Sequence, residues 1–215
     1  MFKFLLLLLV SCPVMAADVE MSVGYTQFGK QENGYWYQDG FAHTLNMSSP
    51  SASIGVTDTF YDRYHYHAGY KYLGHVSTTA QCMGSDALYA VYQKTGQNPL
   101  KLGTFTGDGS VNELYFTAGP EFHFGQYTLG FEAGLTLYRP TWTEQGVGFQ
   151  KVPNGPLYDH TWNFTPKIMT GGLLGVSLGY GRTDIVLSVQ DIDGKDAVWS
   201  VYHGLASNLS VRYRF

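Results

Sequence analysis

The sequence predicts an all-β protein that forms a closed antiparallel up-and-down transmembrane β-barrel of eight strands. Apolar and polar residues alternate over eight separate segments, and this period-two pattern is typical of strands with two unlike faces. Charged residues make up 14% of the 215 residues and aromatic residues 16%, whereas about a quarter of a soluble domain is charged. Beyond the N-terminal segment the chain has no apolar run of about 18 residues, which excludes a membrane-spanning helix.

The N-terminus has the three parts of a secretory signal peptide. Lys3 is followed by an apolar segment, 4–10, and by small residues up to Ala16. We expect cleavage after Ala16, so that 1–16 is the signal peptide and 17–215 is an outer-membrane barrel domain.

The two cysteines fall in different parts of the chain. Cys12 stands in a stretch, LVSC, that resembles the lipidation box of bacterial lipoproteins, so a lipidated Cys12 is an alternative to cleavage after Ala16. If cleavage occurs, Cys82 is the only cysteine of the mature chain, and no internal disulfide is expected.

Four strands are expected in the first half of the mature chain. In the first of them Val19, Met21 and Val23 share one face, and the residues between them are polar. The alternation in the other three is of the same kind. The expected ranges are 19–28, 49–58, 62–74 and 113–124.

Two irregularities are expected within these strands. Residues 44–47 alternate with the opposite parity to 49–58, which predicts a β-bulge near Ser48–Pro50. Pro120 lies inside the fourth strand, and a closed barrel has no free edge for a residue without an N–H, so a second bulge is expected there.

The second half of the chain predicts four more strands. They cover 127–138, 173–180, 183–190 and 204–215. The last strand alternates up to the end of the chain and finishes on Phe215. An even number of antiparallel strands is what a closed bacterial barrel requires.

The connections fall into two classes of length. Tight turns are expected near 59–61, 125–126 and 181–182. The other connections are long, and they cover 30–43, 74–111, 138–167 and 191–203. Short periplasmic turns with long extracellular loops are the barrel pattern. A hairpin formed by 87–93 and 100–105 could add two strands, so ten strands is the alternative.

An eight-stranded barrel is wide enough only for its own side chains, so we expect a filled lumen and no diffusive pore. Alternation places five acids and four bases inside, and charges in such near balance can pair. These residues are Glu20, Glu113, Glu121, Glu132, Asp184, Arg63, Lys71, Arg212 and Arg214.

A cluster of polar residues is expected in the lumen near the periplasmic ends of the third and fourth strands. It contains Arg63, His65, His67, Glu121 and His123. We interpret it as hydrogen-bonded filling and assign no metal, cofactor or catalytic residue. Zinc binding or proton transfer by the imidazoles is the alternative.

The long loops are rich in aromatic residues, which give contact area at low entropic cost. The candidate binding residues are Tyr35, Trp36, Tyr37, Trp142 and Trp162. We therefore expect a surface-interaction protein with lipid and lipopolysaccharide around it and an extracellular ligand. A formal net charge of −4 without a basic stripe argues against nucleic acid as a partner.

The alternative function is an outer-membrane lipid-modifying enzyme. Histidines at the loop edges, among them His75 and His160, could serve such an enzyme. The sequence has no G-x-S-x-G or HExxH motif. A non-enzymatic role is therefore the expectation.

Two short stretches, SVGYTQ (22–27) and VRYRF (211–215), resemble the small eight-stranded surface barrels of the Ail/Lom/OmpX and OmpA type. The resemblance implies an adhesion, resistance or phage-conversion role that is carried by the loops. It also implies that Phe215 is a membrane-insertion signal for the outer-membrane assembly machinery. The loops 74–111 and 138–167 are longer than that family would suggest.

Overall fold

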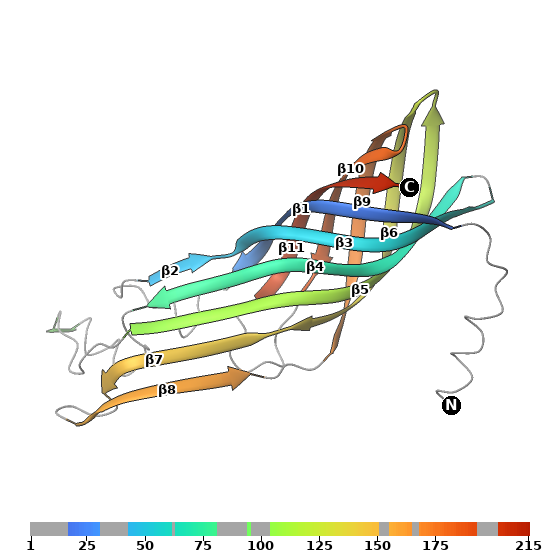
Figure 1. Ribbon diagram of the computed structural model, residues 1–215. Coiled ribbons are helices and arrows are strands. Elements are labelled where there is room, and N and C mark those ends of the chain that lie inside the picture. Colours follow the sequence, from blue (N-terminus) through green and yellow to red (C-terminus); the bar gives the residue numbers. More distant parts are fainter. Residues whose placement is uncertain are drawn as a thin grey trace, which may run out of the picture.

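The computed structural model describes residues 17–30, 43–61, 63–80, 94–95, 104–150, 155–164, 168–192 and 202–215. Eleven strands form one antiparallel sheet (Figure 1). Their bounds are β1 (Asp18–Lys30), β2 (His43–Asn46), β3 (Ser48–Phe60), β4 (Tyr64–Ala80), β5 (Thr104–Phe124), β6 (Tyr127–Pro140), β7 (Trp142–Gln150), β8 (Leu157–Phe164), β9 (Met169–Tyr180), β10 (Thr183–Asp191) and β11 (Tyr202–Arg214).

Eight of these strands close into a barrel, as the sequence predicts. The ring runs β1, β3, β4, β5, β6, β9, β10 and β11, and each strand pairs antiparallel with its neighbour. The ring closes where the first strand meets the last, with Met21 opposite Tyr213 and Val23 opposite Val211. The ten-strand alternative is wrong because β4 and β5 pair directly and leave no room between them for a hairpin. Residues 87–93 and 100–103 of that hairpin lie outside the described residues, and 104–105 belong to β5.

The barrel has an apolar outer surface and a polar interior. Val23, Leu135 and Leu174 point outward and are 68%, 69% and 67% exposed, whereas Thr117 and Thr136 point inward and are 1% exposed. This inverted distribution is that of a barrel surrounded by lipid. No helix in the described ranges has the length and hydropathy of a membrane span.

The tight turns lie at one end of the barrel, together with the first and last residues of the barrel domain. We call this the periplasmic end. Gly125 and Gly181 adopt positive φ angles of 69° and 60° in their turns, a conformation that glycine accepts without steric cost. Exposed aromatic residues surround this end, and the rings of Tyr127 and Tyr180 lie 5.2 Å apart. Such a girdle is typical of the boundary between lipid and water.

At the other end, the strands are longer than expected. β4 and β5 stay paired up to Ala80 and Phe105, so residues 74–80 and 104–111 of the predicted loop 74–111 are strand. The sequence pattern failed here because a bulge at Leu73 shifts the register against β5. Odd-numbered residues of β4 point inward before the bulge, and even-numbered residues such as Val76 are buried after it.

The predicted loop 138–167 is also partly strand. It holds the last residues of β6 and the hairpin of β7 and β8, and β7 pairs with β5 from Thr104 to Asp108. β2 pairs with β4 on the other side. We call β2, β7, β8 and the far ends of β4 and β5 the projecting sheet, which extends beyond the ring (Figure 1).

One of the two expected irregularities is present. β2 and β3 are separated at Met47. Ala52 pairs with Tyr72 and Asn46 pairs with Ser77. Five residues of the β2–β3 segment therefore lie opposite four residues of β4. The bulge expected near Ser48–Pro50 is thus confirmed.

The bulge expected at Pro120 is wrong. The register of β5 against β6 is the same on both sides of it, because Ala118 faces Ala133 and Glu121 faces Gly130. Pairing with β6 is interrupted at Gly119 and Pro120 without an inserted residue. The close approach of the strands is shown at Gly119, where a Cβ atom would clash with the carbonyl oxygen of Phe131.

Apolar side chains fill the outward end of the barrel interior and form a hydrophobic core there. We call it the apolar plug, and it consists of Phe28, Met47, Leu73, Val76, Val111, Tyr138, Trp142, Ile192, Tyr202 and Ala206. The ring of Tyr202 packs edge-on against Phe28 and Trp142, at centroid distances of 5.5 and 6.4 Å. The lumen is therefore closed by hydrophobic packing toward the cell exterior.

Closure of the ring predicts a specific disulfide between the first and last strands. Val23 and Val211 are directly opposite, at a Cα separation of about 5 Å. We expect the V23C/V211C variant, made with Cys82→Ser, to cross-link on mild oxidation. Proteolysis followed by mass spectrometry will detect the joined peptides.

The control pairs V23C with I185C. Ile185 lies opposite Val211 on β10, two strands from Val23, at about 10 Å, and a disulfide cannot span more than about 7 Å between Cα atoms. Equal cross-linking in the two variants, or none in V23C/V211C, would contradict the closed ring.

Candidate functional site

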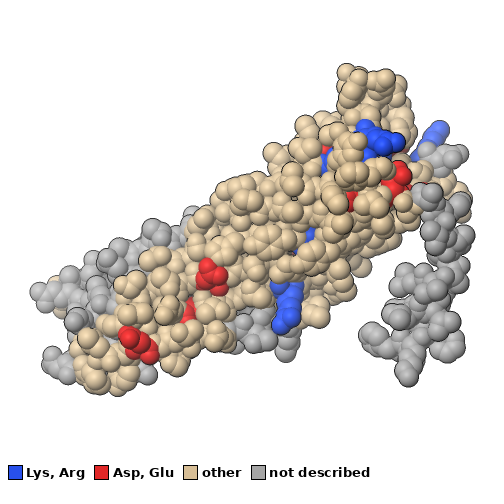
Figure 2. All heavy atoms as spheres, viewed as in Figure 1, with Lys and Arg blue, Asp and Glu red and all other residues tan. Residues whose placement is uncertain are grey.

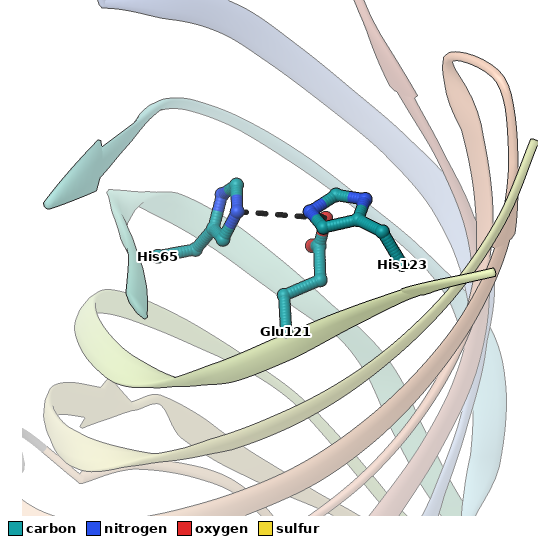
Figure 3. A group of neighbouring side chains, drawn as sticks. All are labelled: His65, Glu121 and His123. Atoms are coloured by element: carbon teal, nitrogen blue, oxygen red, sulfur yellow. Dashed lines mark ion pairs between the residues drawn. The ribbon is translucent and has the colours of Figure 1, made fainter. Parts of the chain in front are cut away.

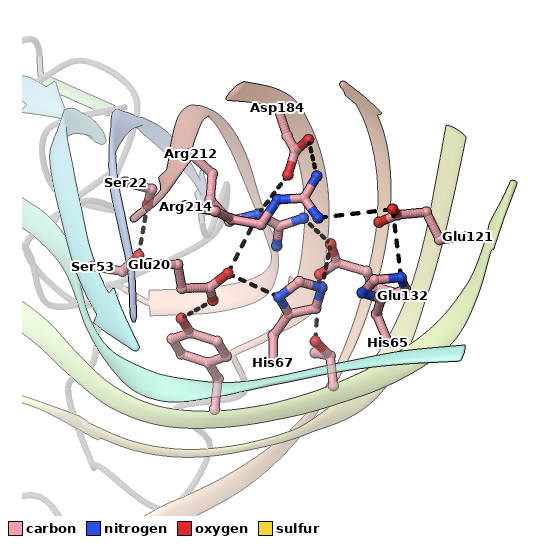
Figure 4. A network of polar contacts seen from close by, with 12 residues as sticks. Glu20, Ser22, Ser53, His65, His67, Glu121, Glu132, Asp184, Arg212 and Arg214 are labelled. Carbon is pink, nitrogen blue, oxygen red and sulfur yellow. Dashed lines mark hydrogen bonds and ion pairs between the residues drawn. The ribbon is translucent and has the colours of Figure 1, made fainter. Parts of the chain in front are cut away.

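The periplasmic half of the lumen holds a network of charged side chains contributed by strands from all round the barrel (Figure 4). We call it the lumen charge network, and its members are Glu20, His67, Glu132, Asp184, Arg212 and Arg214. Each is inward because it occupies the polar parity of its strand.

Arg212 on β11 lies at the centre of this network. Its guanidinium contacts three carboxylates: Nη2 lies 2.8 Å from Glu132 Oε1, and Nε lies 3.2 Å from Asp184 Oδ2 and 3.6 Å from Glu20 Oε2. These acids come from β6, β10 and β1. The ring closes between β1 and β11, and we call this junction the seam. Arg212 therefore links β11 to its two neighbours, β1 and β10, and also to the more distant strand β6. Arg214 adds a second contact to Asp184, at 3.0 Å.

His67 on β4 completes the network. Its Nδ1 lies 2.9 Å from Glu20 Oε2, and its Nε2 lies 3.7 Å from Glu132 Oε1. The hydroxyl of Tyr115 donates to the other oxygen of Glu20 at 3.1 Å. Only 3% of the His67 side chain is exposed, so this imidazole is a filler between two carboxylates.

Eight of the nine charges expected in the lumen point inward. Lys71 lies opposite Glu113 across β4 and β5, and Gln190 donates to the same carboxylate. Arg63 is the exception. The prediction that it points into the lumen is wrong, because it lies exposed in the turn before β4. Only its backbone takes part, since the carbonyl oxygen of Arg63 accepts a hydrogen bond from the Glu121 N–H at 2.8 Å.

The polar cluster expected from the sequence is split by the fold. His65, Glu121 and His123 come together at the periplasmic mouth, and we call them the rim cluster (Figure 3). His65 Nε2 and His123 Nε2 each lie 3.5 Å from Glu121 Oε1. His67 instead belongs to the lumen charge network, so the two histidines of β4 serve different groups.

Space in the network is small. A cavity of about 40 Å³ lies beside Arg212 and is lined by residues such as Ser22, Lys71 and Tyr115. That volume accommodates water but no organic ligand. The lumen at this level is thus packed with protein side chains.

The candidate binding aromatics of the loops do not lie together on one exposed surface in the described part of the chain. Tyr35, Trp36 and Tyr37 lie outside the described residues. Trp142 is buried in the apolar plug and donates to Glu144 at 2.8 Å, so it is not available as a surface anchor. Trp162 lies on β8 and packs edge-on against His160 at 4.6 Å.

Phe215 directly follows the last strand, β11, at the lipid boundary. Its N–H donates to the carbonyl oxygen of Val19 at 2.9 Å, and its ring packs against Tyr213 at 5.0 Å. The terminal aromatic residue is therefore 56% exposed but held in place by the seam.

One of the histidines expected at the loop edges, His75, forms a pair with an acidic residue on the outer surface of the projecting sheet. His75 on β4 is hydrogen-bonded to Asp108 on β5. Ser110 lies directly opposite His75, but its hydroxyl contacts Thr141 at 3.1 Å. Among the described residues, therefore, this pair has no hydroxyl nucleophile hydrogen-bonded to the imidazole.

No family model and no curated protein matches the chain. Among solved structures it is similar to Ail, the attachment invasion locus protein of Yersinia pestis, in complex with the heparin analogue sucrose octasulfate. That match has 14% identity and a TM-score of 0.44 and covers 94% of this chain and 100% of that one.

Two further structures are similar to the chain. Ail of Yersinia pestis in a phospholipid bilayer nanodisc has 16% identity and a TM-score of 0.36, with 93% and 99% coverage. Neisserial surface protein A has 11% identity and a TM-score of 0.33, with 93% and 97% coverage. The fold that the sequence resemblance implied, a closed eight-stranded antiparallel barrel, is the one that the strand pairing of this chain forms.

Removal of the Arg212 guanidinium should destabilise the barrel strongly. The R212M variant leaves Glu20, Glu132 and Asp184 buried without their common cation, and breaking a buried ion pair costs about 3 kcal/mol or more. Tryptophan fluorescence during urea-induced unfolding in lipid vesicles measures this loss. The R212M/E132Q variant should recover part of it.

Arg139 supplies the matched control because it is exposed at the far end of β6. R139Q should change the free energy of unfolding by less than about 0.5 kcal/mol. An R212M midpoint as high as that of R139Q would show that the network does not stabilise the fold.

Proposed function

We propose that the protein is an integral outer-membrane barrel that presents the projecting sheet to a protein partner outside the cell. In this account the barrel is an anchor and the projecting sheet with its adjoining loops is the interaction surface. A filled lumen supports this division, since it favours neither transport nor a bound small molecule.

The observation that carries the proposal is the free edge of the projecting sheet. β8 is the last strand in the sheet order, and within the described part of the chain it pairs with β7 alone. An unpaired strand edge offers N–H and C=O groups to an added strand of a partner. Leu157 and Tyr158 on β8 are 50% and 37% exposed, and Val147 on β7 is 45% exposed.

Charge favours a protein partner over a polyanion. Asp108 and Asp159 are exposed on the projecting sheet, and Figure 2 shows a few acidic groups among uncharged side chains at this end of the molecule. Binding of a sulfated polysaccharide would require a basic stripe. A peptide segment that adds to an edge strand has no such requirement.

Export and insertion belong to the same proposal. Segment 1–16 would be removed after export as a signal peptide, and Phe215 would be read by the outer-membrane assembly machinery. Lipid and lipopolysaccharide would contact the apolar belt. The hydrogen bond from the Phe215 N–H to the Val19 carbonyl oxygen, where the first and last strands meet, supports a role of the last residue in barrel assembly.

Surface display tests the proposal. Cells that express the full chain should bind at least one member of a panel of immobilised serum and matrix proteins more strongly than cells without it. Replacement of 142–164 by a short Gly-Ser turn removes β7 and β8 and should reduce this binding at least tenfold. Heparin belongs in the panel, and we expect no retention by it.

The control replaces the periplasmic turn 125–126, which lies at the opposite end of the barrel. This variant should bind as the unmodified chain does, with equal amounts of each protein in the outer membrane. Binding that survives loss of β7 and β8, or the absence of binding to any protein of the panel, would contradict the proposal.

A further inference from the structure

The rim cluster has a composition and a shape that the lumen charge network does not share. His65 lies on β4, and Glu121 and His123 lie two residues apart on β5, so that all three point into the periplasmic mouth (Figure 3). Two imidazoles and one carboxylate are a ligand set that Zn²⁺ prefers in proteins. We propose that His65, Glu121 and His123 bind a divalent transition-metal ion of the zinc class.

The distances between the donor atoms fit one small ion. A tetrahedral ion with bonds of about 2.05 Å holds its ligand atoms about 3.4 Å apart. His65 Nε2 and His123 Nε2 each lie 3.5 Å from Glu121 Oε1, and the donor atoms all lie within 4.8 Å of one another. A small rotation of either imidazole therefore completes the coordination, without backbone movement.

The shared oxygen supplies an independent observation. Glu121 Oε1 is buried and accepts no hydrogen bond from any described residue. A buried acceptor without a hydrogen bond is costly, and most such groups have a partner. A metal ion between the two imidazoles would be that partner.

Neighbouring groups hold the ligands in place. The Thr59 hydroxyl lies 3.3 Å from His65 Nδ1 and 3.4 Å from His65 Nε2, so it contacts the edge of the imidazole that carries both nitrogens. The Glu121 N–H donates to the Arg63 carbonyl oxygen, which fixes the backbone between β5 and the turn before β4.

One neighbouring charge opposes the ion. Arg214 Nη1 lies 3.8 Å from Glu121 Oε1 and would repel a cation there. The same guanidinium contacts Asp184 through Nη2 at 3.0 Å, so part of its charge is already balanced. We therefore expect a site of moderate affinity that responds to the metal concentration of the periplasm.

The position of the site determines what the ion does. It would join β4 to β5 at the periplasmic end, opposite the end at which the chain connects these two strands, and so act as a clip across them. The His123 side chain is 53% exposed, which leaves a fourth coordination position open to solvent. Because the ion binds the folded state, it adds to stability as its concentration rises above the dissociation constant.

Titration with Zn²⁺ tests the inference on the full chain purified from membranes and freed of metal with a chelator. A fluorescent zinc indicator as competitor should report one site per chain. H65A and H123A each remove one of three ligands and should weaken binding at least roughly tenfold, since loss of even an outer-shell partner has an effect of that size. Circular dichroism will verify that both variants are folded.

The matched control is H160A, which removes an exposed histidine that packs on Trp162 at the other end of the molecule. It should bind Zn²⁺ with unchanged affinity. As a second readout, Co²⁺ should give the intense visible absorption of a tetrahedral site in the unmodified chain and in H160A but not in H123A. Equal Zn²⁺ affinity in H65A, H123A and the unmodified chain, or no binding by the unmodified chain, would overturn the inference.

Discussion

The contact on which the rest of the structure depends is that of Arg212 with three carboxylates inside the barrel. A charge in the lumen of so narrow a barrel must be paired, and its partners can come only from other strands. Glu20, Glu132 and Asp184 meet this need from β1, β6 and β10. The contact thereby joins the last strand to the first and closes the ring.

The same constraint fixes the register of every strand. A shift by one residue would exchange the two faces of a strand. It would place Arg212 or Glu20 in lipid, where a charged side chain is destabilising to a degree that grows toward the midplane. The tyrosine and leucine residues on the other parity would then enter a lumen that has no room for them. Pairing inside and lipid outside thus select one arrangement.

The two halves of the lumen use different means of closure. The periplasmic half is filled by the lumen charge network, and the outward half by the apolar plug with Trp142 and Tyr202. This division explains why function is expected at the two ends rather than along an axis. The outward end carries the projecting sheet, and the periplasmic mouth carries the rim cluster.

The alternation of the sequence was sufficient to predict the eight barrel strands, the short turns and eight of the nine inward charges. It failed where one inserted residue, Leu73, reverses parity, because a pattern of period two cannot count through a bulge. It also placed His67 with His65, since both share one face of β4. His65 and His67 lie about 7 Å apart along β4. Which of them contacts Glu20 therefore depends on the stagger between the strands.

Burial of the outward tryptophan could not be predicted for a similar reason. Trp142 follows a polar residue in a stretch that resembles a loop, and only the return of β7 along β5 brings it over the apolar plug. Pairings between segments distant in the chain leave no local signal.

The central claim is that this chain is a closed barrel inserted in the outer membrane. The most direct measurement compares unheated and boiled samples of the outer-membrane fraction on one SDS gel. The account predicts two mobilities, because a closed barrel resists SDS until it is heated. A single mobility in both lanes, with the protein recovered from the soluble periplasmic fraction, would contradict it.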